Sequence, residues 1–142
     1  MLKKTLIGSL IFLLYTPLSA YDLRSNMLQL GAELAEVQKS FIASDQKGVE
    51  DSIKRFAQHS QDLLGDKDNF TAMLPANKKH KAREAVMSAQ IISHNVQIIL
   101  DAIENKRNQS GIVRREEAQR AYTYIEHACF RCHNIVRDEY KQ

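Results

Sequence analysis

The most chemically specific residues in the sequence stand near its C-terminal end, in the order Cys129-Phe130-Arg131-Cys132-His133. This C-x-x-C-H spacing is the attachment signature of a c-type haem. Residues three apart on a helix share one face, so the thiols of Cys129 and Cys132 can reach the two vinyl groups of one porphyrin. The imidazole of His133 can then bind the haem iron as its proximal ligand. The pattern predicts one covalently attached haem c.

Three other uses of a C-x-x-C pair are a structural disulfide, a zinc site and a thioredoxin-like redox pair. A disulfide would leave the adjacent His133 unexplained. Zinc needs about four ligands, but the chain has only two cysteines and its other histidines show no paired zinc spacing. A thioredoxin-like pair belongs in a βαβ unit, whereas strand-type alternation is missing from this sequence. Haem attachment is therefore the favoured interpretation.

Residues 1–20 have the parts of a secretory signal peptide. Lys3 and Lys4 form a positive start, an apolar run follows, and Ala20 ends a cleavage site. The apolar run is short for a transmembrane helix, although a retained N-terminal anchor is the alternative. Covalent haem attachment of the bacterial kind takes place outside the cytoplasm, so export to the periplasm agrees with the C-x-x-C-H motif.

The mature chain, residues 21–142, has the length of a single domain. The full sequence carries 20 basic and 17 acidic residues, and two of the basic ones lie in the signal. The mature chain is therefore close to neutral. This near-neutral charge does not indicate a nucleic acid partner.

The rest of the chain has the pattern of helices, because apolar residues recur at alternating steps of three and four. We expect four helices, over residues 22–44, 46–64, 79–106 and 112–141. Asp22 and Asp45 are suitable N-caps of the first two, and Gly65 can end the second. A polar connection that contains Pro75 joins the second helix to the third. Helices of this length, each with one apolar stripe, predict an all-α, antiparallel up-down-up-down four-helix bundle.

The bundle predicts where a second iron ligand lies. In an up-down-up-down order the first and last helices are antiparallel neighbours. Met27 is roughly 7–8 Å from the start of the first helix and His133 roughly 12 Å from the end of the last, at 1.5 Å per residue. Met27 also lies in the apolar stripe. The rivals at the same end of the bundle are His59, Met73 and Met87, and ordinary core filling is the other use of Met27.

Two stretches of the sequence resemble known haem proteins. The run DLRSNM at residues 22–27, with the apolar residues that follow it, resembles the opening helix of the periplasmic four-helix b-type cytochrome. The C-x-x-C-H motif, with Arg137 four residues after His133, resembles cytochrome c prime and its low-spin monohaem relatives, the class II c-type cytochromes. The first resemblance implies that Met27 is an axial ligand of the haem iron.

The chain departs from the cytochrome c prime pattern in two places. Val136 stands where the family usually has Tyr, and Arg24 lies three residues before Met27, where the family commonly has four. If Leu28, four residues after Arg24, were the distal residue, the iron would be five-coordinate, as in the gas-binding members of the family. Leu28 lies off the apolar stripe, however, whereas Met27 lies on it.

Arginines are the candidates to hold the haem propionates, because a guanidinium matches the geometry of a carboxylate. The candidates are Arg24, Arg131 and Arg137, of which only Arg137 has a counterpart in the family motif. The Lys78-Lys79-His80-Lys81 run is typical of a solvated helix start. It also lies at the predicted haem end, where it could steer an acidic redox partner.

With His133 and Met27 on its two faces, the iron has no free position for a substrate, which is typical of outer-sphere electron transfer. We expect a periplasmic one-electron carrier, not an enzyme, that exchanges electrons with redox proteins of the periplasm or the inner membrane. The alternatives are a five-coordinate binder of nitric oxide or carbon monoxide and a haem subunit of a larger respiratory complex. Polar outward faces favour a monomer over a homodimer.

Overall fold

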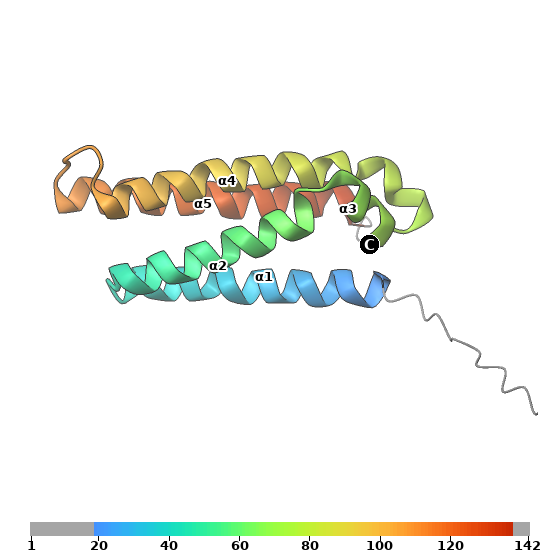
Figure 1. Cartoon of the computed structure of the whole chain (residues 1–142), viewed down its shortest axis with the longest axis horizontal. Helices are drawn as coiled ribbons and strands as arrows, with labels where there is room; N and C mark the ends of the chain where they lie inside the picture. Colours follow the sequence, from blue (N-terminus) through green and yellow to red (C-terminus); the bar gives the residue numbers. More distant parts are fainter. Residues whose placement is uncertain (1–18, 138–142) are drawn as a thin grey trace, which may run out of the picture.

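The computed structural model describes residues 19–137, and all regular structure within them is helical. Four long helices make up most of this part of the chain, with two short helical segments between the second and the third. The long helices lie side by side (Figure 1). The elements are α1 (Ser19–Ile42), α2 (Gln46–Leu64), α3 (Lys67–Met73), η1 (Ala76–Lys81), α4 (Arg83–Glu104) and α5 (Gly111–Val136). The predicted all-α class is confirmed for this part of the chain, which is compatible with a helical bundle.

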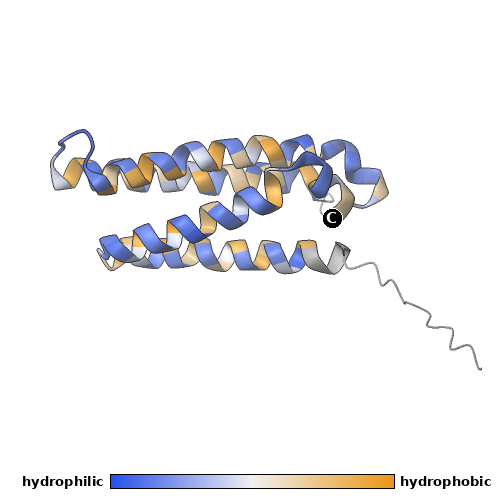
Figure 2. Cartoon of the chain, viewed as in Figure 1, coloured by the Kyte–Doolittle hydropathy of each residue, from blue (hydrophilic) through white to orange (hydrophobic). Residues whose placement is uncertain are grey.

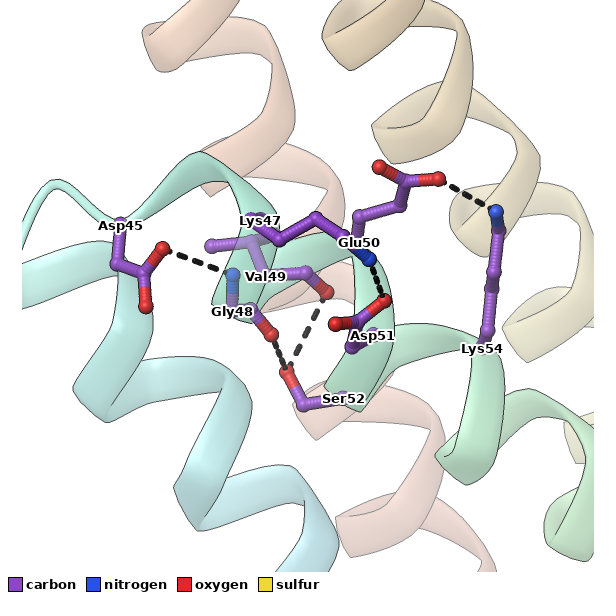
Figure 3. Close-up of polar contacts among 8 residues, drawn as sticks. All are labelled: Asp45, Lys47, Gly48, Val49, Glu50, Asp51, Ser52 and Lys54. Atoms are coloured by element: carbon purple, nitrogen blue, oxygen red, sulfur yellow. Dashed lines mark hydrogen bonds and ion pairs between the residues drawn. The ribbon is translucent and has the colours of Figure 1, made fainter.

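The bounds of α2 follow from its capping residues. The carboxylate of Asp45 accepts a hydrogen bond from the backbone N–H of Gly48 at 2.9 Å (Figure 3), which satisfies one of the free donors at the helix start. At the other end, the N–H of Gly65 donates to the carbonyl of Gln61 at 2.9 Å. Both the predicted range 46–64 and the predicted caps of this helix are confirmed.

The predicted connection between the second and third helices contains helical structure that the apolar pattern did not indicate. Asp66 caps α3 by accepting hydrogen bonds from the N–H groups of Asp68 and Asn69 at 2.9 and 3.0 Å. Leu74 then takes an extended conformation with ψ 147°, as the residue before a proline prefers. The 3₁₀ helix η1 follows Pro75, so α4 begins at Arg83 and not at the predicted Lys79.

Other predicted boundaries are corrected at the ends of the chain. Asp22 lies inside α1, which begins at Ser19, so Asp22 is not its N-cap. α5 begins at Gly111 and ends at Val136, where Arg137 turns to an extended conformation with ψ 160°. The predicted signal up to residue 18, and the predicted end of the last helix at Lys141, lie outside the described residues. No helix within residues 19–137 is long and apolar enough to cross a membrane.

The hydrophobic core lies between two pairs of helices. α1 packs against α2, α4 packs against α5, and α2 contacts α4 across the two pairs (Figure 1). Apolar and polar residues alternate along the long helices at helical spacing, so each of these has one face for the core (Figure 2). The largest fully buried side chains are those of Val37, Ile53, Phe56, Phe70, Ile92, Ile99 and Ile125.

α1 and α5 meet through Tyr122. Its hydroxyl donates to the backbone carbonyl of Leu34 at 3.4 Å, and its ring packs edge-on against Phe41 with the centroids 5.8 Å apart. Earlier in α1, the stripe residues Leu23 and Met27 are only partly buried. The first part of α1, before its contacts with Tyr122 at Leu34 and Phe41, therefore leaves space between itself and α5.

We expect Ile125→Ala to destabilise the protein by about 2–5 kcal/mol, because Ile125 is fully buried and its truncation leaves a cavity in the core. Denaturant unfolding followed by circular dichroism measures the change. Ile112→Ala is the matched control on the same helix, since Ile112 is 62% exposed and its truncation costs within about 0.5 kcal/mol. Equal losses for the two variants would contradict the assigned core.

Candidate functional site

A cavity of about 200 Å³ lies between α1 and the last turns of α5. Side chains of α2 and α4 close its inner side. The residues that line it are Met27, Leu30, Gly31, Leu34, Phe56, Leu64, Ser88, Ile92, Cys129, Phe130, Cys132 and His133. The wall is almost wholly apolar, and its reactive groups are two thiols, one imidazole and one thioether. The thiols and the imidazole come from α5 and the thioether comes from α1, the two helices that were predicted to supply the iron ligands.

The α5 side of the cavity carries both cysteines and the histidine of the C-x-x-C-H motif. Cys132 is buried and Cys129 is partly buried, and both are free thiols. His133 is partly buried beside them and Phe130 is 60% exposed at the margin. The predicted sharing of one helix face by Cys129 and Cys132 is therefore seen, since both thiols line the same cavity.

Burial sets the protonation of these three groups. It raises the pKa of Cys129 to about 11, with smaller contributions from the neighbouring Cys132 and Glu126. Burial also raises the pKa of Cys132, against a lowering hydrogen bond from Ser88. It lowers the pKa of His133, with help from the positive charge of Arg137. At neutral pH the cavity holds two protonated thiols and a neutral imidazole, whose lone pair is available to a metal.

The α1 side of the cavity carries Met27, one turn before Gly31. No atom lies within 4 Å of the Cβ that a side chain at Gly31 would add, so this stretch of α1 faces open space. Leu28, the alternative distal residue, is 67% exposed and is not part of the wall. Of these two neighbours, only Met27 faces the C-x-x-C-H motif across the cavity.

The other rivals of Met27 lie elsewhere in the described structure. His59 on α2 is hydrogen-bonded through Nδ1 to Glu33 Oε1 at 2.6 Å and lies 3.1 Å from the Gln29 amide. Met73 at the end of α3 packs against the core, and Met87 on α4 is partly buried. None of the three lines the cavity.

The three arginines that were predicted to hold the haem propionates are exposed and do not line the cavity. Arg24 is on α1, one turn before Met27. Arg131 lies 3.5 Å from Glu84 of α4, so its guanidinium already has a carboxylate partner. Arg137 follows the last residue of α5 and acts on the pKa of His133. The charge of Arg131 also partly offsets the rise in the pKa of Cys132, so two of the three arginines act on a cavity residue.

The lysine run forms the end of η1, where α5 terminates. The ammonium group of Lys81 donates to the backbone carbonyl of Ile135 at 2.7 Å, so it holds η1 against α5. Lys79 and His80 are exposed. One lysine of the run therefore has a structural role in the described chain, while its exposed members remain open to a partner.

Sequence reasoning missed the inner wall of the cavity. Phe56 of α2 and Ile92 of α4 were predicted as members of apolar stripes that fill the core, and Leu64 only as the last residue of α2. Ser88, whose hydroxyl donates to the carbonyl of Ala128 at 3.2 Å, ties α4 to the turn that precedes Cys129. Gly31 gave the one available signal, because a glycine one turn after Met27 interrupts the side chains on that face.

Comparisons with family models, with curated proteins and with solved structures found no match for this chain. Within residues 19–137, no group of three or more His, Cys, Asp or Glu side chains is placed to hold a metal ion. What the cavity offers is two thiols for covalent attachment and two soft or borderline donors, an imidazole and a thioether, on facing walls.

Proposed function

We propose that this chain is an exported monohaem c-type cytochrome of the class II kind, which carries single electrons. One observation supports this function above the others. Cys129, Cys132 and His133 line the same cavity as Met27, and no other methionine or histidine of the described chain does so. The chemistry of this donor set fits a covalently held haem c, whose iron His133 and Met27 would bind.

Haem iron supplies a one-electron couple between its ferric and ferrous states. The chain's own residues would hold it in place and shield it. The thiols of Cys129 and Cys132 would form the two thioether links, while the apolar side chains of Leu30, Phe56 and Ile92 would exclude water. A thioether ligand and burial both favour the ferrous form, which suits an electron carrier.

The finer arrangement of the bundle belongs to the same proposal. In an antiparallel up-down-up-down order, the start of α1 lies beside the end of α5, and Met27 and His133 stand at similar heights. Their shared cavity is consistent with that order. Exposure of Leu28 weighs against the five-coordinate alternative, in which Leu28 would be the distal residue and nitric oxide or carbon monoxide the ligand.

Export places this carrier in the periplasm, where redox proteins of the periplasm or the inner membrane would be its partners. Lys79 and His80 are exposed at the end of the molecule that holds the cavity, so an acidic partner surface would be attracted to it. The carrier is not an enzyme in this proposal, and a monomer is preferred to a homodimer. A role inside a larger respiratory complex would instead appear as co-purification from native membranes.

The visible spectrum of the purified protein, oxidised and reduced, tests the function. We expect a low-spin ferric spectrum with a far-red band from the methionine–iron bond, and a ferrous spectrum that carbon monoxide leaves unchanged. A high-spin ferric spectrum with ready carbon monoxide binding would assign the gas-binding function in place of electron transfer.

Gly31→Leu should leave the protein folded but reduce the amount of haem that it binds. A leucine side chain at this position would start in open space beside the cavity, because no atom lies within 4 Å of its Cβ. We expect the haem-free protein to gain about 0.5–1 kcal/mol of stability from the better helix former. Covalent haem incorporation, measured by pyridine haemochrome per protein, should fall severalfold.

Ala32→Leu is the matched control for this variant, because Ala32 is the next residue of α1 and is exposed. It adds the same side chain outside the cavity, so haem incorporation should stay at the wild-type level. Normal loading of Gly31→Leu would show that the prosthetic group does not occupy this part of the cavity.

A further inference from the structure

A second cavity, of about 140 Å³, lies at the other end of the helices, away from the C-x-x-C-H motif. The end of α1, the start of α2, the end of α4 and the start of α5 meet there. Its lining residues are Ser40, Phe41, Ser44, Asp45, Gln46, Val49, Ala102, Ile103, Gly111, Arg114, Arg115, Ala118 and Gln119. Apolar side chains form its inner part, and two guanidinium groups stand in its wall.

Arg114 lines this cavity, and one of its donors has no partner. Its Nη1 donates to the carbonyls of Ala102 and Ile103 at 3.1 and 3.3 Å, in the last turn of α4. Its Nε is fully buried and has no hydrogen-bond partner. In the described part of the chain, no carboxylate forms an ion pair with Arg114. A buried charged donor without an acceptor is unusual in a folded protein and calls for one.

The other charges of the cavity agree with a negative ligand. Arg115 is exposed beside Arg114 and adds a second positive charge. Asp45 is the only acid in the wall, and its carboxylate is turned to the backbone of α2, where it accepts from Gly48 N–H at 2.9 Å (Figure 3). The wall therefore has an excess of positive charge, with the hydroxyl of Ser40 and the amide of Gln46 as further polar groups.

We propose that this cavity binds a small organic monocarboxylate with a single ring or a short alkyl chain. The carboxylate would accept hydrogen bonds from the guanidinium groups of Arg114 and Arg115. Its apolar part would contact Phe41, Val49 and Ile103. The volume fits such a ligand, because an apolar cavity of about 150 Å³ holds a benzene ring. This site is independent of the haem proposal, since none of its residues lines the first cavity.

The test is a titration of the mature protein with sodium benzoate, followed by ¹⁵N–¹H correlation spectra. We expect saturable shifts at the backbone amides of Val49 and Gly111. Benzyl alcohol, which has a similar shape and no charge, should bind at least tenfold more weakly, because a hydrogen bond to a charged group is lost. Absence of saturable shifts at these amides, or equal binding of the two compounds, would overturn the proposal.

Variants of α5 assign the binding to the two arginines. Arg114→Gln should weaken benzoate binding at least tenfold, since the uncharged amide cannot replace the charged donor. Arg115→Glu should weaken it about fivefold by reversing an exposed charge. Arg120→Glu is the matched control, because Arg120 is exposed on the same helix outside this cavity. The affinity of this variant for benzoate should differ less than twofold from that of the wild type.

Circular dichroism of each variant establishes that it is folded. Arg114→Gln also removes hydrogen bonds to α4, so this variant could unfold. In that case the comparison of Arg115→Glu with Arg120→Glu alone decides whether the cavity binds benzoate. Equal effects of these two charge reversals would mean that benzoate responds to the net charge of α5, and the site would be withdrawn.

Discussion

Met27→Leu is expected to abolish the far-red absorption band of the ferric protein while the haem stays covalently attached. Leucine has a similar volume to methionine but no sulfur to donate, so the iron would lose its sixth ligand and keep His133. Because a Met ligand raises the reduction potential of a His-ligated haem, the midpoint potential should fall by on the order of 100 mV. Carbon monoxide should then bind to the ferrous variant, at the position that the thioether leaves open.

The control for this substitution is Met87→Leu. Met87 is partly buried on α4 and does not line the cavity, so the same chemical change there should leave the band and the potential as in the wild type. If the band survives in Met27→Leu and disappears in Met87→Leu, the cavity has been assigned to the wrong methionine. If the wild type has no such band, the gas-binding alternative becomes the better function.

The sequence predicts helices well where local chemistry decides their ends. α2 has the predicted bounds because Asp45 and Gly65 act on their own neighbours, and those interactions need no tertiary contact. The start of α4 was wrong because Pro75 is followed by a 3₁₀ helix, whose short turns leave little apolar periodicity to detect. The contact of Lys81 with the carbonyl of Ile135 also depends on a residue far along the chain.

The candidate site divides in the same way. The C-x-x-C-H motif carries its geometry in its spacing, so its three residues could be named from the sequence. Met27 needed a bundle topology as well, because its distance from His133 depends on how α1 and α5 are placed. The sequence could not decide which arginine contacts the haem propionates, since a surface guanidinium can find a local partner, as Arg131 does with Glu84.

The cavity itself follows from an incomplete core. The predicted stripe of α2 is buried along its length, whereas Leu23, Met27 and Leu34 of α1 are only partly buried. The polypeptide alone leaves Met27 and Leu34 facing free space toward α5. An apolar wall left partly uncovered beside two thiols is what a covalently held porphyrin would complete, and periodicity cannot distinguish it from a helix packed on another helix.

Replacing both thiols, as Cys129→Ser with Cys132→Ser, is expected to remove all covalently attached haem. Serine hydroxyls do not add to the vinyl groups, so no thioether link can form, although His133 and Met27 remain. Haem stain on a denaturing gel should be absent, while the wild type retains it. Because haem would be the only occupant of the cavity, the variant should also unfold at lower denaturant concentration than the wild-type holoprotein.

Each single substitution should leave one thioether link and therefore a stained band, with the absorption maximum of the reduced protein shifted by the one vinyl group that stays unsaturated. His133→Ala, by contrast, removes the proximal ligand and leaves both thiols in place. If the double variant kept its haem on a denaturing gel, attachment would have to run through other residues. If the wild type showed no stain and its thiols proved free in the exported protein, Cys129 and Cys132 would need another function.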